Sequence, residues 1–326
     1  MRRPVLSFLS LLVLVVLPAA GCNGGGGSKT AQTSPSLSPS STAAAQTPPS
    51  VTVTARDYGF DVPSEIEGGV VRLTLRNTGQ HTHEAVIVEA GATPLDRLRA
   101  DLTPIVESAG KATPGYLKFR GGVSLVRAGT SSSATVTLPP GQYVMVCTLT
   151  DADTLDTANQ PDEAAPAPDA PTFHFNQGMA VPFTVRTANT AVMPPTDGAF
   201  VAHDWSYDLP ALKPGTRTYT FRNDGAQDHT LAVAEFGEGI DEAAARSVFG
   251  QFLAAQATGK EPPDALPTPD DIAFAGPLSA GGAATFTVEL KPNRTYVFAC
   301  YLSDRTGGPV HAIAKNMVAY ATTPAG

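Results

Sequence analysis

Apolar and polar residues alternate in short stretches along most of this 326-residue chain. The alternation is clearest at residues 71–75 and 134–138 in the first half, and at residues 218–221 and 284–290 in the second. A period of two puts one face of a β-strand in a core and the other face in solvent. Several short, half-buried strands in each half predict an antiparallel β-sandwich in each.

Each half also contains one stretch with helical spacing. In the first half, apolar residues recur on one face after Thr93 and Pro94, which suit the cap and the first position of a helix. In the second half, they follow Asp241. We expect both stripes to pack against the sheets and assign them no chemistry. They comprise Leu95, Leu98, Leu102 and Ile105, and then Val248, Phe249, Phe252 and Leu253.

The two halves repeat each other in order. The segment DYGFDVP that starts at Asp57 is matched by DWSYDLP from Asp204, and RNTG at residues 76–79 is matched by RNDG at residues 222–225. The strand-like run before Cys147 is matched by the run before Cys300. Offsets between 137 and 153 residues indicate a tandem duplication of one domain. A cluster of Asn, Thr, Pro and Gly between the copies predicts domains at 51–187 and 198–326.

The N-terminus has the pattern of an export signal. Arg2 and Arg3 precede an apolar run, and small residues then lead to Cys22 in a stretch, AAGC, that resembles a bacterial lipobox. We expect residues 1–21 to be removed as a signal peptide and Cys22 to carry a lipid; the alternative is an ordinary cleaved signal with an incidental cysteine. Residues 22–50 are mostly small and polar, which predicts a flexible tether. The expected product is an extracytoplasmic lipoprotein, held to the bacterial membrane or envelope by its lipid alone.

Composition narrows the class of protein further. A hydrophobic fraction of 42% and a charged fraction of 16% suit a soluble globular chain, and 30 Gly with 29 Pro favour short strands and turns. The formal net charge of -8 disfavours a sequence-independent grip on phosphates, so no nucleic acid partner is expected. Three cysteines are too few for a disulfide framework.

Two of the three cysteines end equivalent strands, one in each half. Outside the cytoplasm free thiols normally oxidise into pairs, so an unpaired cysteine needs a reason to persist, and metal ligation is one. Histidine and methionine occupy matching places around both cysteines, and four of the six histidines fall there. The candidate metal ligands are His83, Cys147, His174 and Met179 in the first half, and His229, Cys300, His311 and Met317 in the second.

A predicted sandwich with a histidine after an Asn-x-Gly turn and a closing Cys, His and Met resembles the cupredoxin, or blue copper, family. The resemblance covers residues 51–323 in two copies. It implies an all-β chain of two tandem Greek-key β-sandwiches, each with one inserted helix. It also implies a copper site of two imidazoles, one thiolate and a weak axial thioether in each. Soft sulfur with imidazole suits copper, although zinc also accepts such a site. We therefore expect one or two mononuclear copper ions, one-electron transfer and a redox protein partner.

Two features depart from the family pattern. The cysteine and the second histidine are separated by 26 residues in the first half and by 10 in the second, where many blue copper proteins have only a few. Asparagine often follows the first copper histidine, whereas Glu84 and Thr230 stand there in this chain. Copper storage or delivery, with a copper donor or acceptor as partner, therefore stays open, as does a metal-free binding module. A disulfide between Cys147 and Cys300 is the structural alternative, because an oxidising compartment favours it.

The residues beside the cysteines argue against a second kind of metal centre. In multicopper oxidases and copper nitrite reductases the resemblance implies a histidine next to the cysteine, and neither Cys147 nor Cys300 has one. We therefore expect no oxygen or nitrite chemistry and no enzyme activity. His81 and His203 are expected to face solvent, with an extra surface ligand as the alternative for His81. The acidic insertion at 151–171 is interpreted as a surface loop, with a gate over the site or an acidic docking surface as alternatives.

Overall fold

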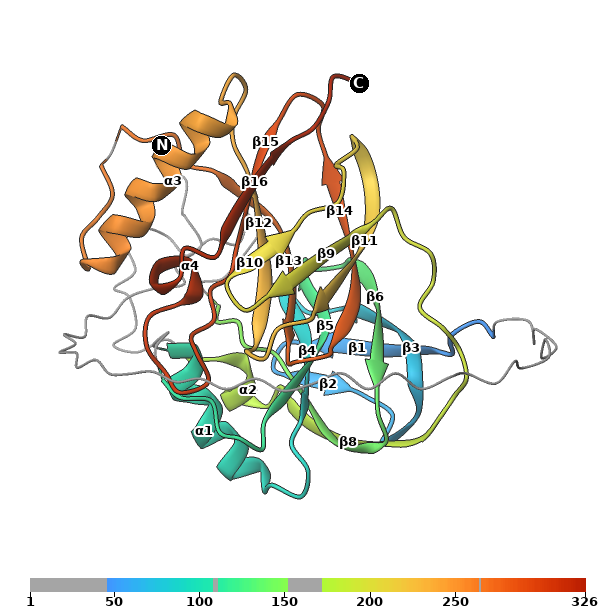
Figure 1. Ribbon diagram of the computed structural model, residues 1–326. Coiled ribbons are helices and arrows are strands. Elements are labelled where there is room, and N and C mark those ends of the chain that lie inside the picture. The colour runs from blue at the N-terminus through green and yellow to red at the C-terminus, as the bar shows by residue number, and fades with distance from the viewer. Residues whose placement is uncertain (1–45, 108–110, 152–171, 264) are drawn as a thin grey trace, which may run out of the picture.

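A computed structural model of the chain describes residues 46–107, 111–151, 172–263 and 265–326 (Figure 1). Three of the predicted features lie outside these ranges. They are the signal peptide with Cys22, nearly all of the tether, and the acidic insertion after Asp151. Within the described ranges no helix has both the length and the apolar character needed to cross a membrane.

Among the described residues, strands dominate each half and two helices accompany them in each. The first half contains β1 (Ser50–Arg56), β2 (Gly59–Asp61), β3 (Glu65–Asn77), β4 (His83–Glu89), α1 (Leu95–Glu107), β5 (Lys118–Val126), β6 (Ser131–Leu138), β7 (Gly141–Val146), α2 (His174–Gln177) and β8 (Ala180–Ala188). The second half contains β9 (Ala199–His203), β10 (Ser206–Asp208), β11 (Gly215–Asn223), β12 (His229–Glu235), α3 (Glu242–Ala257), β13 (Asp270–Leu278), β14 (Ala283–Leu290), β15 (Thr295–Ala299), α4 (His311–Ala314) and β16 (Val318–Thr322).

The two halves share one strand topology. In the first, β3 pairs parallel with β1 and antiparallel with β6, and the second sheet runs β8, β7, β4, β5. In the second, β11 pairs parallel with β9 and antiparallel with β14, and the second sheet runs β16, β15, β12, β13. Each strand has its counterpart at the same place in the order. The predicted all-β fold of two tandem sandwiches is confirmed, while the exact domain limits stay a prediction.

Alternation along the strands explains how the cores form. In β3, Val71, Leu73 and Leu75 are at most 3% exposed, whereas Arg72 and Arg76 between and beyond them point to solvent. Burying such aliphatic side chains stabilises the fold by roughly 1.5–3 kcal/mol each, which fixes the register because a one-residue slip would expose all of them.

The two predicted helices pack on the outer faces of the sheets that carry the histidines. Leu98 and Leu102 of α1 belong to one buried cluster with Val144 of β7, and Phe249 of α3 is clustered with Val297 of β15. The helix α3 begins where Asp241 accepts a hydrogen bond from the N–H three residues later, as an N-cap does. The one-turn helices α2 and α4 were not predicted, because four residues are too few to show a helical period.

The two halves contact each other through paired strands. Leu278 of β13 pairs with Arg120 of β5, and Ala284 of β14 pairs with Val136 of β6. Figure 1 shows the blue-to-green first half and the yellow-to-red second half meeting along these strands.

Candidate metal centres

A buried asparagine fixes the loop before each first histidine. The Asn77 amide donates to the carbonyl oxygens of His81 (2.7 Å) and Val126 (2.8 Å), and its Oδ1 accepts from the N–H of Gly79 (2.9 Å). Asn223 makes the equivalent three bonds in the second half. The Asn-x-Gly motif therefore sets the turn that delivers a histidine to the start of β4 and of β12.

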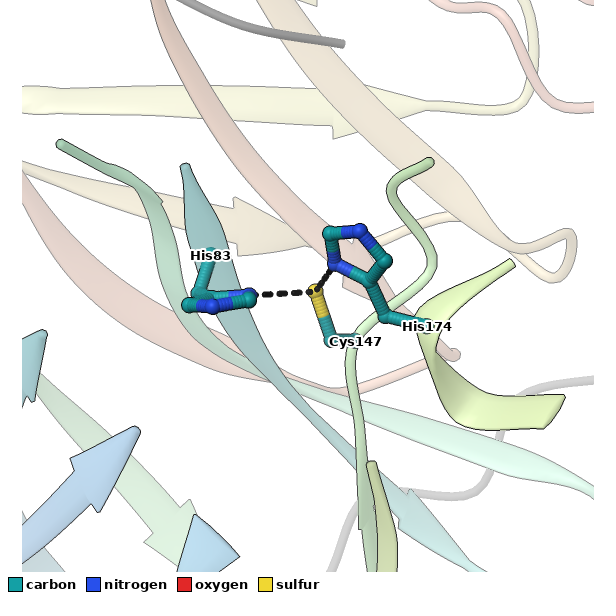
Figure 2. Close-up of side chains that lie close together, drawn as sticks. All are labelled: His83, Cys147 and His174. Atoms are coloured by element: carbon teal, nitrogen blue, oxygen red, sulfur yellow. Dashed lines mark hydrogen bonds between the residues drawn. The ribbon is translucent and has the colours of Figure 1, made fainter. Parts of the chain in front are cut away.

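Three side chains of the first half meet at one end of its sandwich (Figure 2). His83 is the first residue of β4, Cys147 directly follows β7, and His174 begins α2. Cys147 Sγ lies 3.9 Å from His83 Nδ1 and 3.4 Å from His174 Nδ1. All three side chains are fully buried, and their donor atoms lie within 4.8 Å of one another.

The second half repeats this arrangement. His229 is the first residue of β12, Cys300 follows β15, and His311 begins α4. Cys300 Sγ lies 3.6 Å from His229 Nδ1 and 3.4 Å from His311 Nδ1, and all three residues are fully buried. The structure thus brings together six of the eight predicted ligands as two groups of three.

The spacing of the donor atoms fits one metal ion in each group. An ion that binds nitrogen at about 2.0 Å and sulfur at about 2.3 Å, with an angle of about 120° between the two bonds, holds the nitrogen and sulfur atoms about 3.7 Å apart. The four sulfur–nitrogen separations run from 3.4 to 3.9 Å. A thiolate with two imidazoles is a donor set that suits copper, with zinc as the competing ion. Each half can hold one mononuclear ion with little rearrangement of its ligands.

Matching backbone hydrogen bonds hold the second histidine over the cysteine. The N–H of His174 donates to the carbonyl oxygen of Leu149 (2.8 Å), and the N–H of Phe175 donates to that of Cys147 (3.0 Å). The second half repeats both bonds, at 2.7 and 2.9 Å, around His311. The segments between cysteine and histidine differ in length, but the same two backbone hydrogen bonds join their ends in each half.

The two predicted axial methionines are buried beside the cysteines. Met179 and Met317 are both 0% exposed and belong to the same apolar core as Cys147 and Cys300. The N–H of each cysteine donates to the carbonyl oxygen of its methionine, at 3.1 Å in the first half and 3.2 Å in the second. The methionines therefore lie next to the sites, and coordination by their thioethers stays a prediction.

Carboxylates stand behind the imidazoles of the first site, which the sequence did not indicate. His83 Nε2 lies 3.1 Å from Asp57 Oδ1, and His174 Nε2 lies 2.9 Å from Asp151 Oδ1. A carboxylate accepts the Nε2 proton, so the lone pair of Nδ1 points toward the sulfur. Such partners fix the ring orientation and make an imidazole a stronger ligand.

The second site has only one bond of this kind. His311 Nε2 lies 3.1 Å from Asp304 Oδ1. His229 Nε2 is 3.7 Å from Asp204 Oδ1, too far for a hydrogen bond, and this buried nitrogen has no other partner among the described residues. The two sites therefore differ in the groups behind their ligands, although their ligands match.

The buried imidazoles are poised to be neutral. Burial lowers the pKa of His83 to about 4 and that of His229 to about 4, and burial also lowers the pKa of His311. Burial raises the pKa of Asp57, but hydrogen bonds from the N–H groups of Gln80 and His81 outweigh it and hold that pKa below its usual value. A neutral imidazole keeps the lone pair that a metal ion needs.

An aromatic side chain from the repeated Asp-aromatic pair packs edge-on against the second histidine of each site. The rings of Tyr58 and His174 lie 5.5 Å apart in a T-shaped arrangement, and those of Trp205 and His311 lie 5.1 Å apart in the same way. These contacts help to exclude water from the imidazoles. The sequence repeat displayed both pairs, but only the fold shows what they cover.

The remaining predicted features are not part of the donor groups, although the His81 ring lies 6.1 Å from that of His174. His81 is 31% exposed and His203 is 44% exposed, and neither belongs to a group of converging ligands among the described residues. No disulfide joins Cys147 to Cys300 in the part of the chain that the structure describes; each sulfur faces the two imidazoles of its own half. The disulfide alternative is therefore wrong.

Comparisons with known proteins found similar solved structures. No protein-family model and no curated protein matches the chain. An auracyanin from the photosynthetic bacterium Roseiflexus castenholzii is 29% identical over 39% of this chain and 94% of its own, with a TM-score of 0.26. A copper-containing nitrite reductase from Thermus scotoductus is 13% identical over 86% of this chain and 62% of its own, with a TM-score of 0.22. A blue copper oxidase from Nitrosomonas europaea is 12% identical over 86% of each chain, with a TM-score of 0.23. The strand topology and the two ligand groups of this chain are themselves what the resemblance to the cupredoxin family implies, in both halves.

One expectation is corrected by these comparisons. Enzyme activity was excluded because neither cysteine has a neighbouring histidine. That exclusion was wrong, since the similar structures that span 86% of this chain are a nitrite reductase and an oxidase. The physical reason is that a histidine next to the cysteine in the sequence indicates only one way of connecting two metal centres. It does not indicate whether a substrate can react at a mononuclear site.

Proposed function

We propose that the chain binds copper at the two His-Cys-His groups and carries single electrons there. The observation that supports this most is the preformed geometry of both groups. In each, a thiol and two imidazoles are fully buried, with sulfur and nitrogen 3.4–3.9 Å apart. Bound copper would supply a one-electron redox couple, and the chain would supply its ligands and exclude water.

The rigidity of the surroundings favours electron transfer over storage or delivery. The first histidine of each site begins a strand, the cysteine follows another, and backbone hydrogen bonds tie the second histidine to the cysteine segment. Ligands held on paired strands move little when the charge at their centre changes, and small rearrangement is what fast electron transfer needs. Metal delivery would instead need ligands that open, and each of these is 0% exposed.

Metal content and visible absorption of the mature protein test this function. With Cu(II) we expect about two copper ions per chain and strong visible absorption from thiolate charge transfer. Cys147→Ser and Cys300→Ser should each remove one ion and its share of the colour. His81→Ala is the matched control, because His81 lies in the same loop as His83 but outside the donor group. It should leave both readouts unchanged.

Other outcomes identify the other functions. A colourless protein with stoichiometric Cu(I) would indicate storage or delivery to a copper acceptor. A melting temperature that does not respond to copper would indicate a metal-free binding module, because a ligand that binds only the native state must raise it. Preferential retention of zinc at equal availability would overturn the choice of metal.

We further propose that the mature chain is a lipoprotein of the cell envelope. The support is the sequence alone: a basic start, an apolar run, and Cys22 after small residues, followed by a polar tether. The redox partner would then be a protein that reaches the same side of the membrane. Fatty acid labelling of intact cells should mark the wild-type chain and not Cys22→Ser. Equal labelling of both would exclude the anchor.

A further inference from the structure

We propose that the two metal sites are poised at different reduction potentials, with the first site lower and the second higher, so that an electron shared between them resides on the second. This inference rests on the proposed function. It follows from three differences between the sites, each in residues that do not ligate the metal: the carboxylates behind the imidazoles, the residue after the first histidine, and the donors to sulfur.

The first difference lies behind the imidazoles. Both histidines of the first site have a carboxylate at hydrogen-bond distance, Asp57 at 3.1 Å and Asp151 at 2.9 Å. In the second site only His311 has one, and Lys315 Nζ lies 3.4 Å from the other oxygen of that carboxylate, that of Asp304. A carboxylate makes imidazole a better donor and stabilises the more positive, oxidised state of a site. The first site receives this stabilisation through two hydrogen-bonded carboxylates. The second receives it through one, which a cation opposes, and more weakly through the charge of Asp204 at 3.7 Å from His229 Nε2.

The second difference is the residue after the first histidine. Glu84 is 3% exposed, and its carboxyl group accepts hydrogen bonds from both the N–H and the hydroxyl group of Thr148. Thr148 directly follows Cys147, so an acidic group stands beside the sulfur of the first site. The second site has neutral Thr230 at this place. The other charged groups near the second site, Asp228 and Arg305, form an ion pair and add no net charge.

The third difference is at the sulfur itself. In the first site, Cys147 Sγ accepts the N–H of Glu84 at 3.5 Å, and the Glu84 side chain has no hydroxyl group to donate. In the second, Cys300 Sγ accepts the N–H of Thr230 at 3.5 Å and, more weakly, its hydroxyl group at 3.8 Å. Hydrogen bonds to a thiolate withdraw negative charge from it and favour the reduced state, so they raise the potential. All three differences act in the same direction.

The consequence is an ordered pair of one-electron sites in one chain. When an external one-electron donor reduces the chain once, one electron enters, and at equilibrium it occupies the second site while the first stays oxidised. A second electron then reduces the first site. We expect the equilibrium to favour the second site at least tenfold, which for one electron corresponds to 59 mV.

Reductive titration of single-site variants tests the order of the potentials. Cys300→Ser leaves the first site and Cys147→Ser leaves the second, and each is loaded with copper and titrated anaerobically with dithionite while its visible absorption is followed. The reduction potential of the first site should be lower than that of the second by at least the difference that corresponds to the tenfold factor. Equal potentials, or the reverse order, with copper bound at both sites would overturn the inference alone. Failure of both variants to bind copper would overturn the proposed function with it.

Matched substitutions behind the ligands test the cause. Asp57→Asn in the first site removes the charge of a bonded carboxylate and should raise that site's potential. Asp204→Asn in the second removes a carboxylate that is 3.7 Å from His229 Nε2 and not hydrogen-bonded to it, and should change that site's potential less. Glu84→Gln should raise the first potential, and Thr230→Val should lower the second. If Asp57→Asn shifts the potential of its site no more than Asp204→Asn does, the hydrogen bonds to the carboxylates do not set the difference in potential between the two sites.

Discussion

Arg305 is the side chain whose removal should most weaken the contact between the two halves. One of its nitrogens bonds Asp228 of the second half (2.5 Å), and the other donates to the carbonyl oxygens of Pro114 (3.0 Å) and Leu117 (2.8 Å) of the first half. The Asp228 side chain is only 3% exposed, and burial raises its pKa despite the bonds that it accepts from Ser279 and Arg305. Without the guanidinium, a buried carboxylate would keep a single hydroxyl donor.

The expected cost of Arg305→Ala follows from that burial. Breaking a buried ion pair by removing one partner typically destabilises a protein by about 3–5 kcal/mol, because the other charge stays desolvated. At about 2–4 °C per kcal/mol for a chain of this size, the melting temperature should fall by about 6–20 °C. Adding Asp228→Asn to Arg305→Ala should recover about half of the loss, since the amide needs no cation.

Calorimetry or circular dichroism melts of the metal-free protein measure these changes. Arg186→Ala is the matched control: Arg186 also pairs with a carboxylate, that of Glu65, but the two side chains are 62% and 51% exposed, so little change is expected. The reasoning fails if Arg305→Ala lowers the melting temperature no more than Arg186→Ala does. If the loss is large but Asp228→Asn recovers none of it, the cost comes from the lost bonds to the first half and not from the uncompensated charge.

Three further predictions concern the sites. In the metal-free folded protein, the pKa values of His83 and His229 are lowered to about 4. Between pH 6.5 and pH 4 these histidines are therefore neutral in the folded chain but protonated in the unfolded chain. The free energy of unfolding should fall by about 3 kcal/mol per histidine as the pH drops from above 6.5 toward 4. Urea unfolding at several pH values checks this, and a flat profile would contradict it. Gly79→Ala places a methyl group against the Asp57 carboxylate and should weaken copper binding at the first site by about tenfold while sparing the second, as competition with a chelator would reveal. Asn77→Ala removes three hydrogen bonds from a buried turn and should cost about 3 kcal/mol in urea unfolding; a cost below about 1 kcal/mol would show that water replaces the amide.

The duplication explains why so much of the fold and the ligand set could be predicted. A single histidine at the start of a strand has many ordinary explanations, but His83 and His229 occupy the same place in two copies, each before a cysteine that ends an equivalent strand. Alternation identified other strands, such as those at residues 71–75 and 284–290, because one face of each is buried, whereas the strands that begin with these histidines are buried on both faces. The repeat therefore separated residues with a shared role from residues that only happen to lie nearby.

The groups behind the ligands could be predicted only in part. Asp57 and Asp204 occupy matching places in the repeat, and in the structure each accepts hydrogen bonds from the loop of its Asn-x-Gly turn, but the repeat did not show that either carboxylate would lie near a histidine. Asp151 and Asp304 also occupy matching places, each four residues after its cysteine, but the segments that follow them differ in length, so the match alone did not assign them a role. Only the folded chain shows that both reach the Nε2 atom of the second histidine.

Segment length was a poor guide to whether the second histidine could reach its cysteine. The separations of 26 and 10 residues depart from the family pattern and put copper binding in doubt, yet His174 and His311 lie at the same 3.4 Å from sulfur. The cause is local: the residue before the long segment and the histidine after it are joined by backbone bonds that do not depend on what lies between. Longer loops cost little extra closure entropy, about 0.6 kcal/mol for each doubling of length, so a few hydrogen bonds are enough to hold both ends together.

The same reasoning makes a prediction about the insertion: deleting residues 153–170 while keeping Asp151 should leave copper binding at the first site intact. Loss of that site in the shortened chain would show that the insertion itself holds the ligands in place.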